Sequence, residues 1–521
     1  MSQTFLKNLN LLKQSGTFST LTGIQRGIEK EGLRTTPAGE LSQSAHPAAL
    51  GSALAHPSIT TDFSEALLEF VTPVMPTPEA AVNFLEDLHR FAYEILEEEI
   101  IWSSSMPCFL GGESSIPIAQ YGKSNIGTMK HIYRVGLEHR YGKTMQTIAG
   151  IHYNFSLPDD FWTAFRSVVA STESDRDFRD KQYFGLIRNF RRNAWLLLLL
   201  FGASPAVCGS FIKGLDHKLL KLEGKGYYLP WATSLRMGGL GYTSDAQSSF
   251  RVCYNSVESY TSTLGQALNM SYPPYEKIGA KNNGRYLQLN DRLLQIENEY
   301  YSDIRPKRVT PSGAHPLPYL KQHGVEYIEV RNLDLNPFLP VGIDSAQARF
   351  VDSFLLYCLL QDSPQISTDE YAANNQNKTS IIIEGRKPGL KLKRNEETID
   401  AFQWATELTD GIEQTANLLD ESHGNNLHTK AVAAQKNKLL HPDLFPSAQI
   451  LHFADTEKLS FSELGIRLSS QHKANFKEPL PADKRAEMDK IAVESLEKQK
   501  QIEDSDTIDF DDFLTDYFAR S

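Results

Sequence analysis

Three segments in which polar and apolar residues alternate constrain the fold of this chain more than any other feature. They cover residues 27–34, 150–157 and 325–334, and turn or breaker residues bound each of them. Such alternation predicts β-strands with two chemically different faces. Strand and helix signals are interspersed without a regular βαβ rhythm, so the sequence predicts an α+β fold built on an antiparallel sheet.

The clearest helix signal follows Thr77-Pro78-Glu79, an N-cap, a first-turn proline and an early acid, and predicts a helix near residues 78–99. The apolar run 194–201 is too short for the ~20 residues of a membrane helix and predicts a buried helix. The Asn-rich segment 365–378 is interpreted as a surface loop. We expect one catalytic domain over residues 1–480, then a charged helix and a loose acidic tail over residues 481–521.

The composition excludes several classes of function. Lys and Arg number 53 against 64 Asp and Glu, a formal net charge of -11, so no basic field exists to bind nucleic acid or an anionic membrane. The four cysteines are scattered without a CxxC pair, as is typical of the reducing cytosol. No secretory signal is visible near the N-terminus. The expected location is therefore cytoplasmic, and the sequence makes no prediction about protein partners.

Clustered acids are the first sign of chemistry. Glu29 and Glu31 lie two residues apart in a predicted strand and share one face. Close carboxylates raise each other's pKa unless cations neutralise them, and bound magnesium commonly does so. Glu69, enclosed by large apolar residues, needs a partner, and Asp62 is close to it in sequence. The alternatives are a solvated face for Glu29 and Glu31, a capping role for Asp62 and an arginine partner for Glu69.

The other two predicted strands carry further candidates. His152, Asn154 and Ser156 share one strand face, which suggests a lined cavity, although a hydrogen-bonded core histidine is the alternative. Glu329 and Arg331 also share a face that aliphatic residues back. This pair fits a metal-phosphate site, in which arginine binds oxygens bidentately, or a salt bridge on a solvated face.

A search for glycine-rich phosphate loops and common nucleophile motifs is negative. Residues 136–144 resemble a Walker A loop, but five residues separate the two glycines where four are needed. No serine nucleophile elbow, HExxH helix or dinucleotide GxGxxG is present.

Taken together, eight segments in collinear order resemble the bacterial glutamate-cysteine ligases of the proteobacterial type. Their span, about residues 23–390, is the expected motif-bearing core. The segments are GIQRGIEKE (23–31), ITTDFSEALLE (59–69), HYNFS (152–156), YLPWATSLR (228–236), LQIENE (294–299), RPKR (305–308), EYIEVR (326–331) and EGRKPGL (384–390).

This resemblance implies a glutamine-synthetase-like fold, in which a curved antiparallel sheet forms a trough for metal ions between ATP and amino-acid substrates. Arg134 and Arg331 are implied to hold the transferred phosphoryl group of ATP, and Gln146, Asn154 and Arg236 to lie near glutamate. The implied magnesium ligands, with Mn²⁺ as a possible substitute ion, are Glu29, Glu31, Asp62, Glu69, His152 and Glu329. The implied cavity for the cysteine side chain comprises Phe63, Tyr133, Leu137, Tyr242 and Tyr301.

The implied reaction has two steps. ATP converts the γ-carboxylate of glutamate into an acyl phosphate, and the amine of cysteine attacks it to give γ-glutamylcysteine, the first product of glutathione synthesis. Lys30 and Gly32 vary within the first motif, at positions without a catalytic role. Relatives that also perform the next step carry a second ATP-binding domain, for which 521 residues leave no room. We therefore expect the first step only.

Three other interpretations remain open from the sequence. A two-metal amidohydrolase would use water and no ATP, but that class usually recruits several histidines. A catalytically inactive scaffold would be expected to have lost an acid or Arg331. A related ligase could use an amine other than cysteine, which the cavity residues alone do not decide.

Overall fold

The computed structural model describes residues 2–519 except 241–244, 249 and 312–314. At its centre lies a seven-stranded antiparallel sheet in the order β11-β12-β5-β1-β3-β2, with β4 paired to the end of β1. All three predicted strands are confirmed and are neighbours in this sheet, as β1, β5 and β12. The strands are β1 (Gln25–Thr35), β2 (Ile59–Thr61), β3 (Leu67–Val71), β4 (Ile100–Ile101), β5 (Ile151–Ser156), β11 (Ile304–Lys307) and β12 (Tyr327–Leu333).

The register of the sheet decides which side chains meet. Glu29 of β1 pairs with His152 of β5, and Glu31 pairs with Glu69 of β3. Glu329 of β12 pairs with Asn154, two residues from His152 on the same side of β5. Because side chains alternate between faces, this register brings the acids and the histidine of separate strands onto one face.

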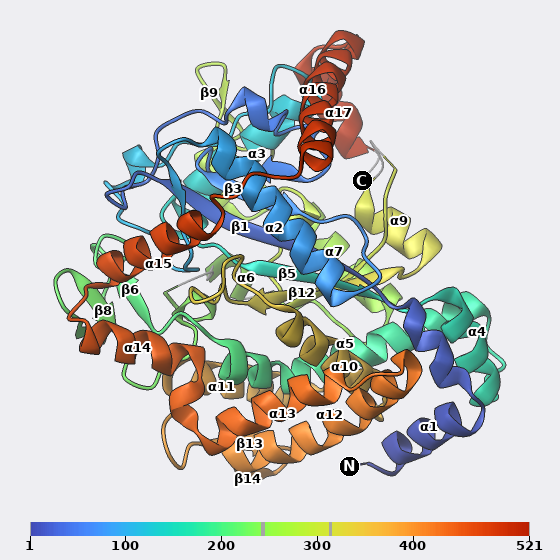
Figure 1. Cartoon of the computed structure of the whole chain (residues 1–521). Helices are drawn as coiled ribbons and strands as arrows, with labels where there is room; N and C mark the ends of the chain where they lie inside the picture. The colour runs from blue at the N-terminus through green and yellow to red at the C-terminus, as the bar shows by residue number, and fades with distance from the viewer. Residues whose placement is uncertain (1, 241–244, 249, 312–314, 520–521) are drawn as a thin grey trace.

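The opposite face is mostly apolar and packs against the helices α2 (Pro78–Ile95), α5 (Asp175–Phe201) and α10 (Ser345–Leu360). Phe70 of β3 packs on His89 of α2 with ring centroids 4.6 Å apart. Tyr153 of β5 donates a hydrogen bond to Asp352 of α10, 2.8 Å away. Figure 1 shows α5 and α10 below the sheet, followed by α12 and α13. These helices support one face of the sheet, and the opposite, polar face carries the candidate catalytic side chains.

Local signals explain the helices. Thr77 caps α2 by accepting a hydrogen bond from the amide of Ala80, as the sequence predicts, and the helix ends at Ile95. The apolar run 194–201 is buried as the last part of α5. Among the described residues, no helix has the length and apolar character needed to cross a membrane.

Two expectations are wrong. The Asn-rich segment forms most of helix α11 (Thr368–Glu384), because Ser367 caps it and buried Asn377 bonds to the backbone of Lys393. The expected loose tail contains helix α17 (Phe510–Ala519), which packs against α3 (Asn125–Tyr141). Figure 1 shows α16 (Ala482–Ser505) and α17 together beside α3.

The remaining elements surround this core. One hydrophobic cluster contains residues from Phe5 to Ala492. The other helices are α1 (Gln3–Gln14), α4 (Asp159–Val168), α6 (Asp245–Ser248), α7 (Val257–Asn269), α8 (Pro273–Ile278), α9 (Pro316–His323), α12 (Ala401–His423), α13 (Leu427–Leu440), α14 (Pro446–Thr456) and α15 (Phe461–Asn475). The small strands are β6 (Ala206–Cys208), β7 (Leu220–Lys221), β8 (Gly226–Tyr228), β9 (Lys281–Asn282), β10 (Arg285–Tyr286), β13 (Lys391–Arg394) and β14 (Glu397–Asp400).

Candidate active site

Three predicted metal ligands converge on the polar face of the sheet. One ligand atom each from Glu29, His152 and Glu329 lies within 4.8 Å of the others. His152 Nδ1 is 3.0 Å from Glu29 Oε2 and 3.6 Å from Glu329 Oε1, and its Nε2 is 3.9 Å from Glu31 Oε1. Asn154 donates a hydrogen bond to the other oxygen of Glu29 at 2.9 Å. The histidine is therefore surrounded by carboxylates instead of lying in an apolar core.

Glu31, Asp62 and Glu69 extend the cluster toward β3. Burial, followed by the charge of Asp62, raises the pKa of Glu31. Burial, followed by the charges of Glu29, Asp62 and Glu31, raises the pKa of Glu69 well above its usual range. These shifts have the direction expected where carboxylates crowd together without enough positive charge.

The other side of the cluster is rich in positive charge. Burial alone would raise the pKa of Glu329, but Arg331 and Lys307 outweigh it and hold that pKa well below its usual range. Arg331 Nη1 donates to Glu329 Oε1 at 2.8 Å. For Glu29, burial is outweighed mainly by the hydrogen bond from His152, so its pKa is also lowered. Glu29 and Glu329 are thus held as anions, ready to bind a cation.

Several buried polar atoms in the site form no hydrogen bond with the described residues. Glu329 Oε2 and Asn154 Oδ1 are buried and accept no hydrogen bond, although Lys307 Nζ lies 3.5 Å from Glu329 Oε2. Arg331 Nε is buried and donates to none of the described residues. Buried groups of this kind carry a desolvation penalty that a bound ligand can remove. The donor set of carboxylate oxygens and one imidazole fits a hard divalent cation.

The two other predicted arginines approach from outside the sheet. Arg134 of α3 donates its Nε to the backbone oxygen of Asp62 and lies 4.6 Å from the ring centroid of Tyr121. Arg236, in a short turn after the segment 228–234, donates to the backbone oxygen of Arg331 at 3.2 Å. The charges of Arg236 and Arg331 offset part of the rise in the pKa of Glu31 that burial causes.

The predicted cysteine cavity is described in part. Phe63 and Leu137 are buried, and Tyr133 and Leu137 lie on α3 beside Arg134. Tyr301 donates a hydrogen bond to Met237 Sδ at 3.0 Å, next to Arg236. Tyr242 lies outside the described residues. Gln146 is buried in the turn Met145–Thr147, and its side chain forms no hydrogen bond with the acidic cluster in the described part of the chain.

Sequence reasoning missed the positive charge of β11. Arg305 pairs directly with Glu329 in the sheet, and Lys307 lies beside it. Both belong to the segment 305–308, which has three cations in four residues. This density of positive charge was the available signal for the site. Pro306 made a strand harder to predict here, because proline in a sheet is confined to edge strands such as β11.

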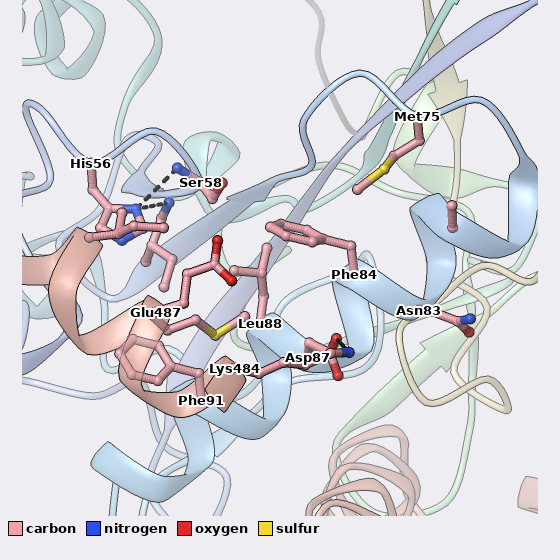
Figure 2. Close-up of a pocket in the computed structure, with 14 residues that line it drawn as sticks. His56, Ser58, Met75, Asn83, Phe84, Asp87, Leu88, Phe91, Lys484 and Glu487 are labelled. Atoms are coloured by element: carbon pink, nitrogen blue, oxygen red, sulfur yellow. Dashed lines mark hydrogen bonds and ion pairs between the residues drawn. The ribbon is translucent and has the colours of Figure 1, made fainter. Parts of the chain in front are cut away.

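A separate cavity lies behind the sheet. Figure 2 shows it between α2 and α16, with Phe84, Leu88 and Phe91 among its lining residues. Its volume is about 240 Å³, and it lies on the face away from the carboxylates. Because its lining is mostly apolar and includes none of the predicted site residues, it is not the candidate active site.

Carboxylates, one histidine and arginines on one face of an antiparallel sheet, with helices behind, define a glutamine-synthetase-like ligase. The family described as glutamate-cysteine ligase matches residues 9–381. The chain belongs to the glutamate-cysteine ligase family.

Similar proteins agree with this assignment. A glutamate-cysteine ligase of Pseudomonas entomophila is 49% identical, with 98% of this chain and 95% of that protein covered. A glutamate-cysteine ligase of Pseudomonas putida is also 49% identical, with 100% of this chain and 99% of that protein covered. The crystal structure of a Francisella tularensis glutamate-cysteine ligase in complex with AMP has a TM-score of 0.90 and 38% identity, over 95% of this chain and 98% of that one. The crystal structure of a bifunctional glutathione synthetase from Pasteurella multocida has a TM-score of 0.72 and 26% sequence identity. The match covers 91% of this chain and 55% of that one.

Proposed function

We propose that this protein joins the γ-carboxylate of L-glutamate to the amine of L-cysteine. The reaction consumes ATP, gives γ-glutamylcysteine, ADP and phosphate, and is the first step of glutathione synthesis. The observation that carries the proposal is the group of Glu29, His152 and Glu329 within 4.8 Å, flanked by Arg331, in a chain of this family. ATP binding is further supported by the AMP held by the Francisella tularensis relative.

Magnesium is the proposed cofactor, and Mn²⁺ is expected to substitute for it. The support is the set of hard oxygen donors, the buried Glu329 Oε2 that accepts no hydrogen bond in the described part of the chain, and the crowding that raises the pKa of Glu69. When bound, the ion would neutralise charge on the phosphate oxygens during transfer. The proposed ligands are Glu29, Glu31, Asp62, Glu69, His152 and Glu329.

The chain's own residues position the reactants. We assign Arg331 and Arg134 to the phosphoryl group, since a guanidinium binds two oxygens at once. Arg236, Asn154 and Gln146 are the proposed glutamate residues. The γ-carboxylate of glutamate attacks the terminal phosphorus of ATP, and ADP leaves. The cysteine amine then attacks the acyl phosphate, loses a proton and expels phosphate, so no protein nucleophile is needed.

The proposed cysteine cavity comprises Phe63, Tyr133, Leu137, Tyr242 and Tyr301. We further propose that residues 1–480 act as one catalytic domain and that the enzyme is cytoplasmic. The latter proposal is supported by the four cysteines, all of which are free thiols.

The decisive experiment measures ADP release by the purified protein with ATP, Mg²⁺, glutamate and one amine at a time. We expect release only when all four are present and cysteine is the best amine. ATP-independent hydrolysis of an amide substrate would favour the amidohydrolase interpretation, which the single histidine of the cluster does not support. Turnover with another amine but not with cysteine would keep the reaction class and change the substrate.

A further inference from the structure

A second pocket lies apart from the acidic face. Its volume is about 850 Å³, and α14 together with the segment around Trp231 forms its walls. The residues that matter for its chemistry are Trp231, Phe338, Arg386, His452 and Phe453. None of them belongs to the proposed catalytic machinery.

Arg386 is the unusual group in this pocket. Its side chain is 8% exposed, and it donates Nη2 to the backbone oxygen of Pro230 at 2.6 Å and Nε to that of Ala232 at 3.3 Å. Within the described part of the chain it forms no ion pair, and burial lowers its pKa to about 10. The carboxylate of Asp443 also lines the pocket, but it is exposed and more than 4.0 Å from any guanidinium nitrogen. A buried cation without an anion is costly, and a bound anion would remove that cost.

Aromatic rings form the rest of the lining. Trp231 is 41% exposed, whereas Trp102, Trp162, Trp195 and Trp404 are at most 7% exposed. Phe338 and Phe453 lie edge to face with centroids 6.2 Å apart. An exposed indole beside two phenylalanines offers a surface on which a planar ring can stack.

We propose that this pocket binds a small anion that carries a planar aromatic ring, with its charge at Arg386 and its ring against Trp231 and Phe338. The two carbonyl bonds use Nε and Nη2, which leaves Nη1 of Arg386 for the anion. None of the lining residues of this pocket belongs to the carboxylate cluster.

The probe is naphthalene-2-sulfonate, with uncharged 2-naphthol as the comparison. Because Trp231 is the one exposed tryptophan, binding should quench tryptophan fluorescence saturably, and a Trp231→Phe variant should lose the quenching but retain binding by calorimetry. We expect 2-naphthol to bind roughly tenfold or more weakly, since a charged hydrogen bond is lost. Binding should persist in saturating glutamate and Mg²⁺, neither of which carries an aromatic ring.

Three variants test the assignment. Arg386→Met should weaken naphthalene-2-sulfonate roughly tenfold or more, whereas Lys387→Met, at an exposed neighbouring cation, should not. Ala448→Trp, on the wall of the pocket, should obstruct part of it and weaken binding without replacing Arg386, which keeps the test valid if Arg386→Met misfolds. Absence of saturable binding to the wild type, or unchanged binding in both Arg386→Met and Ala448→Trp, would overturn the proposal. Because the readout is binding, these results do not depend on the ligase activity.

Discussion

Glu329 is 1% exposed, yet it keeps its negative charge because Arg331 and Lys307 outweigh the cost of its burial. A carboxylate held in this way contributes fixed charge without reorganisation during the reaction, and preorganised charge is usually the largest single contribution to catalysis. Its Oε1 lies 3.6 Å from His152 Nδ1, in the same cluster as Glu29. Substitutions of single residues therefore test the proposed chemistry most directly.

Glu329→Gln keeps the shape of the side chain and removes its charge. We expect the turnover number to fall at least roughly a hundredfold, about 3 kcal/mol, as is typical of removing a key electrostatic group. Glu29→Gln and Glu31→Gln should behave alike in the ADP-release assay. The matched control is Glu326→Gln, because Glu326 is a partly exposed ion-pair partner of Arg308 and directly precedes the same strand. Near-normal turnover of Glu329→Gln would indicate that Glu329 serves only in a structural ion pair with Arg331.

Arg331→Lys should be almost as damaging as Arg331→Ala. A lysine ammonium cannot reproduce the planar, bidentate contact of a guanidinium with phosphoryl oxygens. The measurement is kcat/KM for ATP in the three proteins. If lysine restores most of the rate, Arg331 serves only as the ion-pair partner of Glu329, 2.8 Å away.

The thiol of cysteine should be replaceable, since the amine is the attacking group. We expect L-2-aminobutyrate to be ligated with a penalty of about 1 to 3 kcal/mol, and glycine to be far poorer because it leaves the cavity empty. The enzyme's own thiols should be dispensable: burial raises the pKa of Cys108 and Cys358, so neither is a thiolate. Failure of 2-aminobutyrate, or a glutamyl thioester lost in one cysteine variant, would contradict this mechanism.

Among the elements, α3 connects the proposed site to the end of the chain. It carries Tyr133 and Arg134, and Tyr133 also packs against a cluster formed by Met129, Leu289 and Leu514 of α17. Asn125, at the start of α3, donates its side-chain amide to the backbone oxygen of Ile508 at 2.9 Å. The position of α3 over the site therefore depends on residues near the C-terminus.

Leu514→Ala should raise the KM for cysteine several-fold more than the KM for glutamate, because the packing behind Tyr133 is loosened. Leu514 is 6% exposed, so some stability will also be lost, within the ~2 to 5 kcal/mol of such changes. The control is Leu496→Ala on α16, where the leucine is 40% exposed. A lower melting temperature with both KM values unchanged would limit α17 to a structural role.

The predictability of these elements depended on how far local pattern determines them. The alternation of side chains in β1, β5 and β12 predicts that Glu29, Glu31 and Glu329 each lie on the polar face of their strand. The register of the sheet then brings these residues close together. Helix α11 was missed because its stability comes from a cap and tertiary bonds instead of an apolar stripe. Helix α17 was missed because acidic residues in this segment predict a solvated tail, whereas its aromatic residues pack against α3. The charge of Lys307 became informative only once its partner was known.

The molecule as a whole should be stabilised by the proposed cation. Any ligand that binds only the folded state adds about 2.7 kcal/mol when present at 100 times its dissociation constant. We expect Mg²⁺ to raise the melting temperature of the wild type, and Glu29→Gln and Glu329→Gln to lose this increase. Glu326→Gln should retain it, since its carboxylate lies outside the cluster. An equal increase in all four proteins would indicate a nonspecific ionic effect.

The packing of α17 on α3 also has a consequence for biosynthesis. Every strand of the central sheet has been translated by Leu333, but Met129 and Leu289 obtain their partner Leu514 only much later. Because translation adds about 5 to 20 residues per second, many seconds pass after the proposed metal ligands have been synthesised. During this time the apolar patch formed by Met129 and Leu289 is not covered by Leu514. We therefore expect nonsense mutations between these points to yield chains that contain all proposed ligands yet bind chaperones and are degraded.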